Sequence, residues 1–265
     1  MLAELHNKAG SLCEPARSGQ LRCPLIVRGS SEDVVTDHIV VTLRLLNPRW
    51  WLADLLNGAL GTNRFDRQFY RRLRIEPWCN QAKYPRELLP YDEGSTQVDC
   101  LLSWANPPTT VYIEAKYGSN LSASTANGDA SQGYPTDQLI RNIRVGLHAC
   151  GYFQDDALFD LTPRDFVVVL LSPIKGHPLV RRYRDESLLR AAIPHSDRLI
   201  TLPRSPFIGE LDYADIIAVL RRQAKFFTRP ERTAAEMLIA YLQFKRRHMP
   251  SSRAHQKPLD LWEGG

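Results

Sequence analysis

The sequence VVTDHIVVTLRLL has apolar residues spaced three and four apart, which predicts an amphipathic helix over residues 30–46. Asn47-Pro48 ends this helix and begins another, because asparagine is a good N-cap and proline suits the first helical turn. We expect the second helix to run towards Gly58. The chain therefore begins its regular structure with two adjoining helices.

Three apolar segments rich in β-branched and aromatic residues predict strands over 73–79, 96–104 and 109–116. The last two are separated only by Ala105-Asn106-Pro107-Pro108, whose residues favour a turn, so they form an antiparallel hairpin. Residues 166–171 are all apolar and mostly valine or leucine, which is typical of a strand that is covered on both faces. We place this strand in the interior of the sheet.

Further helices are predicted at about 135–150, 180–192, 211–227 and 231–248. The order of helix, strand, hairpin, helix and strand describes an α/β fold, an α/β/α sandwich with a central mixed β-sheet. We divide the chain into an N-terminal arm (1–29), a core domain (30–200), a helical C-terminal extension of that domain (201–250) and a flexible tail (251–265). The polar segment 118–133 after the hairpin is a functional or disordered loop.

The composition narrows the function classes. The chain has 265 residues, of which 43% are hydrophobic, and it contains neither an apolar run of membrane-spanning length nor a secretory signal. We therefore expect a soluble, cytoplasmic protein without membrane contact. The 5 cysteines and 7 histidines are scattered and form no pattern of zinc ligands or disulfides. Any metal should be bound by oxygen ligands.

The net charge is +5, and the positive charge is concentrated late in the chain. Residues 220–258 contain 10 lysines and arginines but only 2 acidic residues. This excess suits a nucleic acid, and we take Arg221, Arg222 and Lys225 as candidate contacts. A solvated helix face followed by a basic tail would explain the same charges.

The hairpin carries three charges in otherwise apolar strands. If Trp104 lies opposite Thr109, then Asp99 lies opposite Glu114, and the alternation of side chains puts Lys116 on their face of the sheet. Two opposed carboxylates repel each other, and a divalent cation such as Mg²⁺ would relieve that repulsion. Such a cation could polarise a phosphodiester and activate water, while Lys116 orients the water or stabilises negative charge.

The sequence VDCLLSW followed by VYIEAK resembles the PD-(D/E)xK nuclease superfamily over about residues 95–172. The resemblance implies a mixed sheet flanked by helices, as in restriction endonucleases. It also implies that Asp99 and Glu114 bind Mg²⁺, which Mn²⁺ can replace, that the Ala115 carbonyl is a further ligand, and that Lys116 is the catalytic lysine. Many members have proline shortly before the aspartate, where this chain has Gln97-Val98.

The resemblance extends to two helices. Gln138 matches a glutamine near the start of the helix that follows the lysine strand, and Arg141 and Asn142 share its helix face, so they could reach the metal site or a phosphate. Glu32 is similar to a helix acid that some branches use as an extra metal ligand. The alternatives are a solvated helix face and an acid that favours a helix N-terminus. Glu76 and Glu93 are reserve candidates.

These observations predict a Mg²⁺-dependent nuclease that acts on DNA rather than RNA. The resemblance to the superfamily implies an endonuclease of a bacterial defence or restriction system that uses a protein partner or a homodimer. The alternative from another class is a nucleic-acid or partner-binding subunit that keeps the fold without turnover. A glycosidase with paired carboxylates is a third possibility. Trp50-Trp51 and Phe226-Phe227 could stack on bases, but we assign them to packing.

Overall fold

The computed structural model describes residues 32–81, 84–85, 89, 95–117, 134–154 and 163–247. The arm, the tail and the polar segment 118–133 that the sequence singles out lie outside the described residues.

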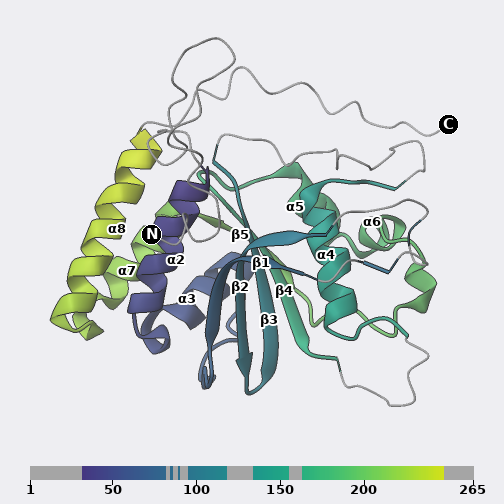
Figure 1. Ribbon diagram of the computed structural model, residues 1–265, viewed down its shortest axis with the longest axis horizontal. Coiled ribbons are helices and arrows are strands. Elements are labelled where there is room, and N and C mark those ends of the chain that lie inside the picture. Colours follow the sequence, from purple (N-terminus) through teal and green to yellow (C-terminus); the bar gives the residue numbers. More distant parts are fainter. Residues whose placement is uncertain are drawn as a thin grey trace, which may run out of the picture.

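The core of the molecule is a five-stranded sheet with the order β1-β2-β3-β4-β5. Neighbouring strands are antiparallel from β1 to β3 and parallel from β3 to β5, so the sheet is mixed, as predicted (Figure 1). The strands are β1 (Arg74–Asn80), β2 (Gln97–Ala105), β3 (Pro108–Ala115), β4 (Asp165–Ser172) and β5 (Ile208–Asp212).

Helices cover both faces of the sheet (Figure 1). On one face lie α2 (Glu32–Leu45), α3 (Pro48–Leu60), α7 (Tyr213–Gln223) and α8 (Arg229–Arg247). On the other lie α4 (Gln138–Ala149), α5 (Pro178–Arg184) and α6 (Glu186–Ala191). Two short 3₁₀ helices, Ser196–Arg198 and Ala224–Phe226, lie in the connections.

Strand β4 explains why the chain contains a continuous apolar run. Its residues 167, 169 and 171 join the apolar cluster under α2, α3, α7 and α8, whereas residues 166, 168 and 170 join the cluster under α4, α5 and α6. A strand between two helical layers buries both of its faces, so the six residues 166–171 between its polar ends are all apolar. The predicted interior position is confirmed, because β4 lies between β3 and β5.

Two helix boundaries differ from the predicted ones for local reasons. Helix α3 continues past Gly58 to Leu60 and stops at Gly61, whose φ of 66° is the left-handed conformation that glycine adopts without strain. Helix α4 begins at Gln138 because the carboxylate of Asp137 caps its N-terminus.

The C-terminal half contains one strand and one helix break that the sequence pattern did not reveal. The helix predicted at 180–192 is divided into α5 and α6 at Asp185, whose extended backbone and capping carboxylate begin α6. The helix predicted at 211–227 is preceded by β5 and begins at Tyr213. Residues 208–212, part of the predicted helical C-terminal extension, therefore complete the sheet beside β4.

The described cysteines, Cys79, Cys100 and Cys150, are free thiols, and the last two are buried among apolar side chains. None of the helices in the described ranges has the length and apolar character needed to span a bilayer.

The contact between α4 and β4 can be tested with two glycines that both lie inside helices. A Cβ added to Gly146 would lie 2.0 Å from Cζ of Phe166, whereas one added to Gly58 meets no atom within 4 Å. We expect Gly146→Ala to lower the free energy of unfolding by about 1–3 kcal/mol through overpacking. The control Gly58→Ala should raise it by up to about 1 kcal/mol. Urea denaturation measures both, and a stable Gly146→Ala would contradict this close contact.

Candidate active site

The hairpin brings the two acidic strand residues together. Backbone pairing between β2 and β3 has the predicted register, and its last pair is Cys100 with Ile113, so Asp99 and Glu114 are the next residues to face each other. Both occupy the face of the sheet that α4 covers. The carboxylates therefore lie at one end of the hairpin, beside the start of α4.

Two further contacts fix the end of β3. The carboxylate oxygen Oδ2 of Asp99 accepts a hydrogen bond of 2.8 Å from the Ala115 amide, across the strand end. The Lys116 amide donates to the carbonyl of Leu171 at 2.8 Å, which prolongs the contact between β3 and β4 by one residue. The backbone around Lys116 is thus held from both neighbouring strands.

Lys116 forms ion pairs with two carboxylates. Its Nζ lies 2.8 Å from Oε1 of Glu114 and 3.0 Å from Oε1 of Glu32. The other oxygen of Glu32 accepts a hydrogen bond of 2.9 Å from the Tyr117 amide. Glu32 is the first residue of α2, so these contacts attach that helix N-terminus to the end of β3 and bring a third carboxylate to the site.

Asn142 of α4 orients Glu114 from the opposite side. Its Nδ2 donates to Oε2 of Glu114 at 2.8 Å, and the two residues are 1% and 2% exposed. The sequence placed Asn142 on a polar helix face and offered it as a nucleic-acid contact. The structure instead buries it against a site carboxylate, a partner that helical spacing alone does not indicate.

The other candidates from the sequence lie at varying distances from these carboxylates. Gln138 begins α4 at the same end of the sheet and is half-buried, as is Arg141 three residues further on. Among the described residues, no hydrogen bond joins Gln138 to the site carboxylates. The reserve candidate Glu76 forms an ion pair with Arg74 on β1, and Glu93 lies outside the described residues.

The predicted basic contacts in the last turn of α7 and in the 3₁₀ helix after it are not at this site. Helix α7 begins at Tyr213, whose ring stacks on Tyr117 at a centroid distance of 6.2 Å, and it runs away from the carboxylates. The guanidinium of Arg222 forms an ion pair with Asp54 of α3 at 2.9 Å. The structure therefore places Arg221, Arg222 and Lys225 towards the other end of the sheet.

A different basic cluster adjoins the site, and no pattern in the sequence indicates this proximity. The Tyr117 hydroxyl donates to the carbonyl of Lys245 at 3.1 Å, and the Lys245 ammonium lies 4.3 Å from the centre of the Tyr117 ring. The C-terminal end of α8 is thereby fixed beside Lys116. The next two residues, Arg246 and Arg247, line an open pocket of about 540 Å³ together with the chain that follows β4.

Burial and like charge strain the site electrostatically. Burial raises the pKa of Asp99 well above its usual value, and the nearby Glu114 carboxylate raises it further, against the opposing effects of Lys116 and the Ala115 amide. Burial by itself lowers the pKa of Lys116, but the surrounding carboxylates, Glu114 foremost, outweigh burial and raise it. Lys116 is therefore a protonated ammonium at neutral pH, able to donate a proton or a hydrogen bond.

The donor set has the chemistry of a site for a hard divalent cation. It consists of carboxylate oxygens, and the buried Oε1 of Glu114 accepts no well-formed hydrogen bond apart from its ion pair with Lys116. Within the described ranges, no three His, Cys, Asp or Glu side chains are arranged as a ready metal site. The Lys116 ammonium lies between Glu32 and Glu114 instead.

Comparisons with protein-family models, curated proteins and solved structures gave no significant match to this chain. The functional interpretation therefore depends on the geometry and chemistry of the site itself.

The raised pKa of Asp99 predicts the pH dependence of a charge-removing variant. Because the folded state raises this pKa, ionisation of Asp99 costs stability, and the cost is absent below the unfolded-state pKa of about 3.9 and complete above the folded-state pKa. Asparagine keeps an oxygen that accepts the Ala115 amide. We expect Asp99→Asn to be more stable than the wild type at pH 7 in urea denaturation, by a margin that shrinks towards pH 4.

Asp185 is the matched control with the opposite sign. It is exposed, and hydrogen bonds from Ser187 and from the Leu188 amide lower its pKa. Its stabilising effect is present above the unfolded-state pKa and is lost as the pH falls through the folded-state pKa. Asp185→Asn should therefore be less stable than the wild type at pH 7. The same sign of change in both variants would contradict the description of the site.

Proposed function

We propose that this protein is a metal-dependent nuclease that hydrolyses phosphodiester bonds of DNA, with a restriction-endonuclease-like fold. The observation that carries the proposal is the convergence of Asp99, Glu114 and Lys116 at the end of the hairpin, where Glu32 joins them. The mixed sheet between two layers of helices is compatible with the fold that the PD-(D/E)xK resemblance implies.

Asp99 and Glu114 would hold Mg²⁺, or Mn²⁺ in its place, with the Ala115 carbonyl and Glu32 as further candidate ligands. Bound there, the cation would supply Lewis-acid polarisation of a phosphodiester and a lowered pKa for the attacking water. Asn142 binds one oxygen of Glu114, and the other oxygen pairs with Lys116. This contact makes Asn142 a positioning residue rather than a substrate contact.

Lys116 would act as a hydrogen-bond donor. Its raised pKa excludes the neutral amine at physiological pH, so it cannot serve as the general base in the state described here. The ammonium can orient a water molecule or stabilise the negative charge that develops on the phosphate. Its ion pairs with Glu32 and Glu114 hold it in place before substrate binds.

Basic residues near the site support a polyanionic substrate. Arg246 and Arg247 line the open pocket beyond β4, next to the Tyr117 that follows the catalytic lysine candidate. Gln138 and Arg141, at the start of α4, remain candidates for contacts with the scissile strand. An endonuclease role in cytoplasmic bacterial defence or restriction, with a protein partner or as a homodimer, rests on analogy with the superfamily.

One observation favours the alternative, a binding subunit without turnover. The Lys116 ammonium already neutralises part of the carboxylate charge, which a bound cation would otherwise do. Loss of one of the three charged residues would be the usual sign of such a subunit. Asp99, Glu114 and Lys116 are all present.

Cleavage of supercoiled plasmid and linear DNA tests the proposal. We expect the wild type to cut in Mg²⁺ or Mn²⁺ but not in EDTA, and Asp99→Ala, Glu114→Gln and Lys116→Ala each to cut at least about 100-fold more slowly. The control Glu186→Gln removes an exposed acid of α6 and should cut normally. A wild type that binds DNA but never cuts would favour the binding subunit.

Metal binding can be measured without any cleavage. A cation that binds only the folded state stabilises it by mass action, by about 2.7 kcal/mol at a concentration 100 times the Kd. We expect Mn²⁺ to raise the unfolding temperature of the wild type and of Glu186→Gln, but not that of Glu114→Gln. A Glu114→Gln protein that gains as much stability as the wild type would exclude Glu114 as a ligand.

A further inference from the structure

A second candidate binding surface lies at the opposite end of the sheet from the carboxylates. The amide of Ala105, at the turn of the hairpin, donates to the carbonyl of Arg71, so the chain between α3 and β1 lies against this turn. Strand β3 leads from the turn to Ala115, over about 25 Å at 3.3–3.4 Å per residue. The two ends of the sheet are therefore well separated.

This end carries an open pocket of about 600 Å³, to which Arg49, Arg67 and Arg71 contribute. We call it the arginine pocket. Its lining contains no acidic residue, and within the described chain none of the three arginines forms an ion pair. Phe69, also in the lining, is 73% exposed, which is unusual for a large apolar side chain. Three arginines without ion pairs in the described chain thus line the same pocket as an exposed aromatic ring.

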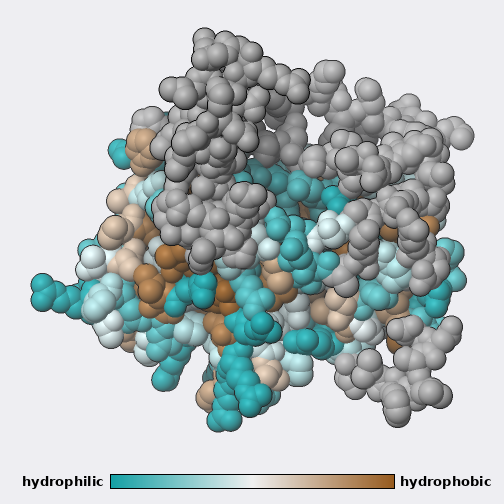
Figure 2. Space-filling view, viewed as in Figure 1, coloured by the Kyte–Doolittle hydropathy of each residue, from teal (hydrophilic) through white to brown (hydrophobic). Residues whose placement is uncertain are grey.

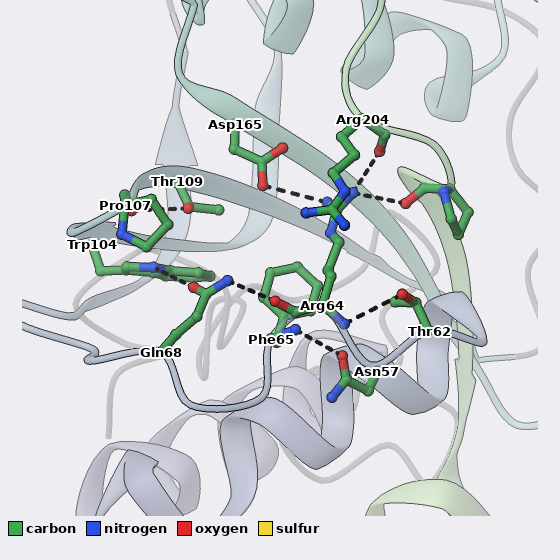
Figure 3. Close-up of polar contacts among 11 residues, drawn as sticks. Asn57, Thr62, Arg64, Phe65, Gln68, Trp104, Pro107, Thr109, Asp165 and Arg204 are labelled. Carbon is green, nitrogen blue, oxygen red and sulfur yellow. Dashed lines mark hydrogen bonds and ion pairs between the residues drawn. The ribbon is translucent and has the colours of Figure 1, made fainter.

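The loop that carries these side chains is anchored from the inside (Figure 3). The side chain of Gln68 accepts a hydrogen bond of 3.2 Å from Nε1 of Trp104 and donates one of 3.0 Å to the carbonyl of Arg64. The Phe65 amide donates to the side chain of Asn57 in α3 at 3.1 Å. Phe65 is buried and Gln68 is half-buried, whereas Arg67, Phe69 and Arg71 are exposed to solvent.

Arg64 connects this loop to the far edge of the sheet (Figure 3). Its side chain is only 2% exposed, it lies 3.6 Å from the carboxylate of Asp165, and it donates to the carbonyls of Arg204 and Pro206. Because a buried guanidinium needs such partners, these contacts fix the loop in one position. The arginine pocket is a preformed feature and not a chance grouping of surface side chains.

The backbone of the loop is strained at two positions, one of which is the pocket residue Arg67. Arg67 and Arg72 have φ angles of 61° and 56°, in the left-handed region that residues other than glycine seldom adopt. Strain of this kind persists only where the surroundings enforce it, and it is concentrated at functional sites.

A cationic and aromatic stack extends the same surface. The rings of Trp50 and Phe226 stack at 4.6 Å, with the Arg49 guanidinium 4.9 Å from one ring and the Lys225 ammonium 4.9 Å from the other. Trp51 and Phe227 are buried, as predicted for packing residues, but Phe226 is 46% exposed. Lys225, predicted from the sequence to bind nucleic acid, belongs to this surface and not to the carboxylate site.

We propose that the arginine pocket binds a single-stranded segment of nucleic acid, with phosphates on Arg67 and Arg71 and an unpaired base stacked on Phe69. A guanidinium group can bind two oxygens of one phosphate at once. An exposed aromatic ring offers a face on which any unpaired base can stack. A duplex hides the faces of its bases, so the ring favours a single strand. The choice of nucleic acid as occupant rests on the proposed function, but the binding itself requires no metal.

Fluorescence anisotropy of labelled dT15 in EDTA tests this proposal. We expect the double variant Arg67→Asn/Arg71→Gln to bind about tenfold or more weakly, with a salt slope smaller by about 1.4 for two lost phosphate contacts. Asparagine tolerates the positive φ at position 67. Phe69→Leu should weaken binding about 5- to 100-fold without a change in the salt slope. Phe69→Trp keeps an aromatic ring and should bind as tightly as the wild type. The control Arg181→Gln/Arg182→Gln removes the same charge from the exposed face of α5 and should bind normally.

Four results would overturn the proposal. If the control variant on α5 bound DNA as weakly as the arginine-pocket variant, the loss of binding would be explained by net charge alone. Unchanged binding by Phe69→Leu, or tighter binding of a duplex of the same length, would exclude base stacking. Equal competition by polyglutamate would indicate an acidic protein as the occupant. The proposed nuclease activity is judged separately, because the arginine-pocket variants can lose binding whether or not the wild type cuts DNA in Mg²⁺.

Discussion

The arrangement of this protein depends on one buried ammonium group shared by several carboxylates. Lys116 attracts Glu114 from its own strand and Glu32 from α2, and this attraction offsets the repulsion that burial makes severe. The same carboxylates bind separate elements, since Glu114 accepts a hydrogen bond from α4 and Glu32 accepts one from the chain after β3. The charges that suit the site for chemistry also hold two helices against the sheet.

Parallel pairing brings several strand ends and helix starts to the end of the sheet where the carboxylates lie. Strands β3, β4 and β5 all point the same way, so α4 and α7 begin near their carboxyl ends, and α8 returns to the same edge with its last turn (Figure 1). Open sheets of this kind bind ligands beyond the carboxyl ends of their strands. Burial raises the pKa of Asp99 there, so keeping this carboxylate ionised lowers the stability of the fold. Strongly shifted pKa values of this kind are concentrated at functional sites.

The sequence predicts those features that depend on local pattern. A proline turn and alternating side chains were sufficient for the hairpin register, and an unbroken apolar run was sufficient for β4. Strand β5 was missed because Gly209 and Glu210 interrupt its short apolar run, and only pairing with β4 defines it. The contact of Asn142 with Glu114 and the approach of α8 to Tyr117 join residues 28 and 128 positions apart, a separation over which local periodicity carries no information.

Helix α8 gives the molecule a mechanical connection between its two ends. Glu231, in its first turn, accepts a hydrogen bond from the Asn47 amide next to the arginine pocket, while Lys245, in its last turn, lies over the Tyr117 ring. The 19 residues between Arg229 and Arg247 form a rod of about 28 Å. Because α8 is one unbroken helix, the Asn47 backbone at one end of the sheet and the Tyr117 ring at the other are held at a fixed separation by a single element.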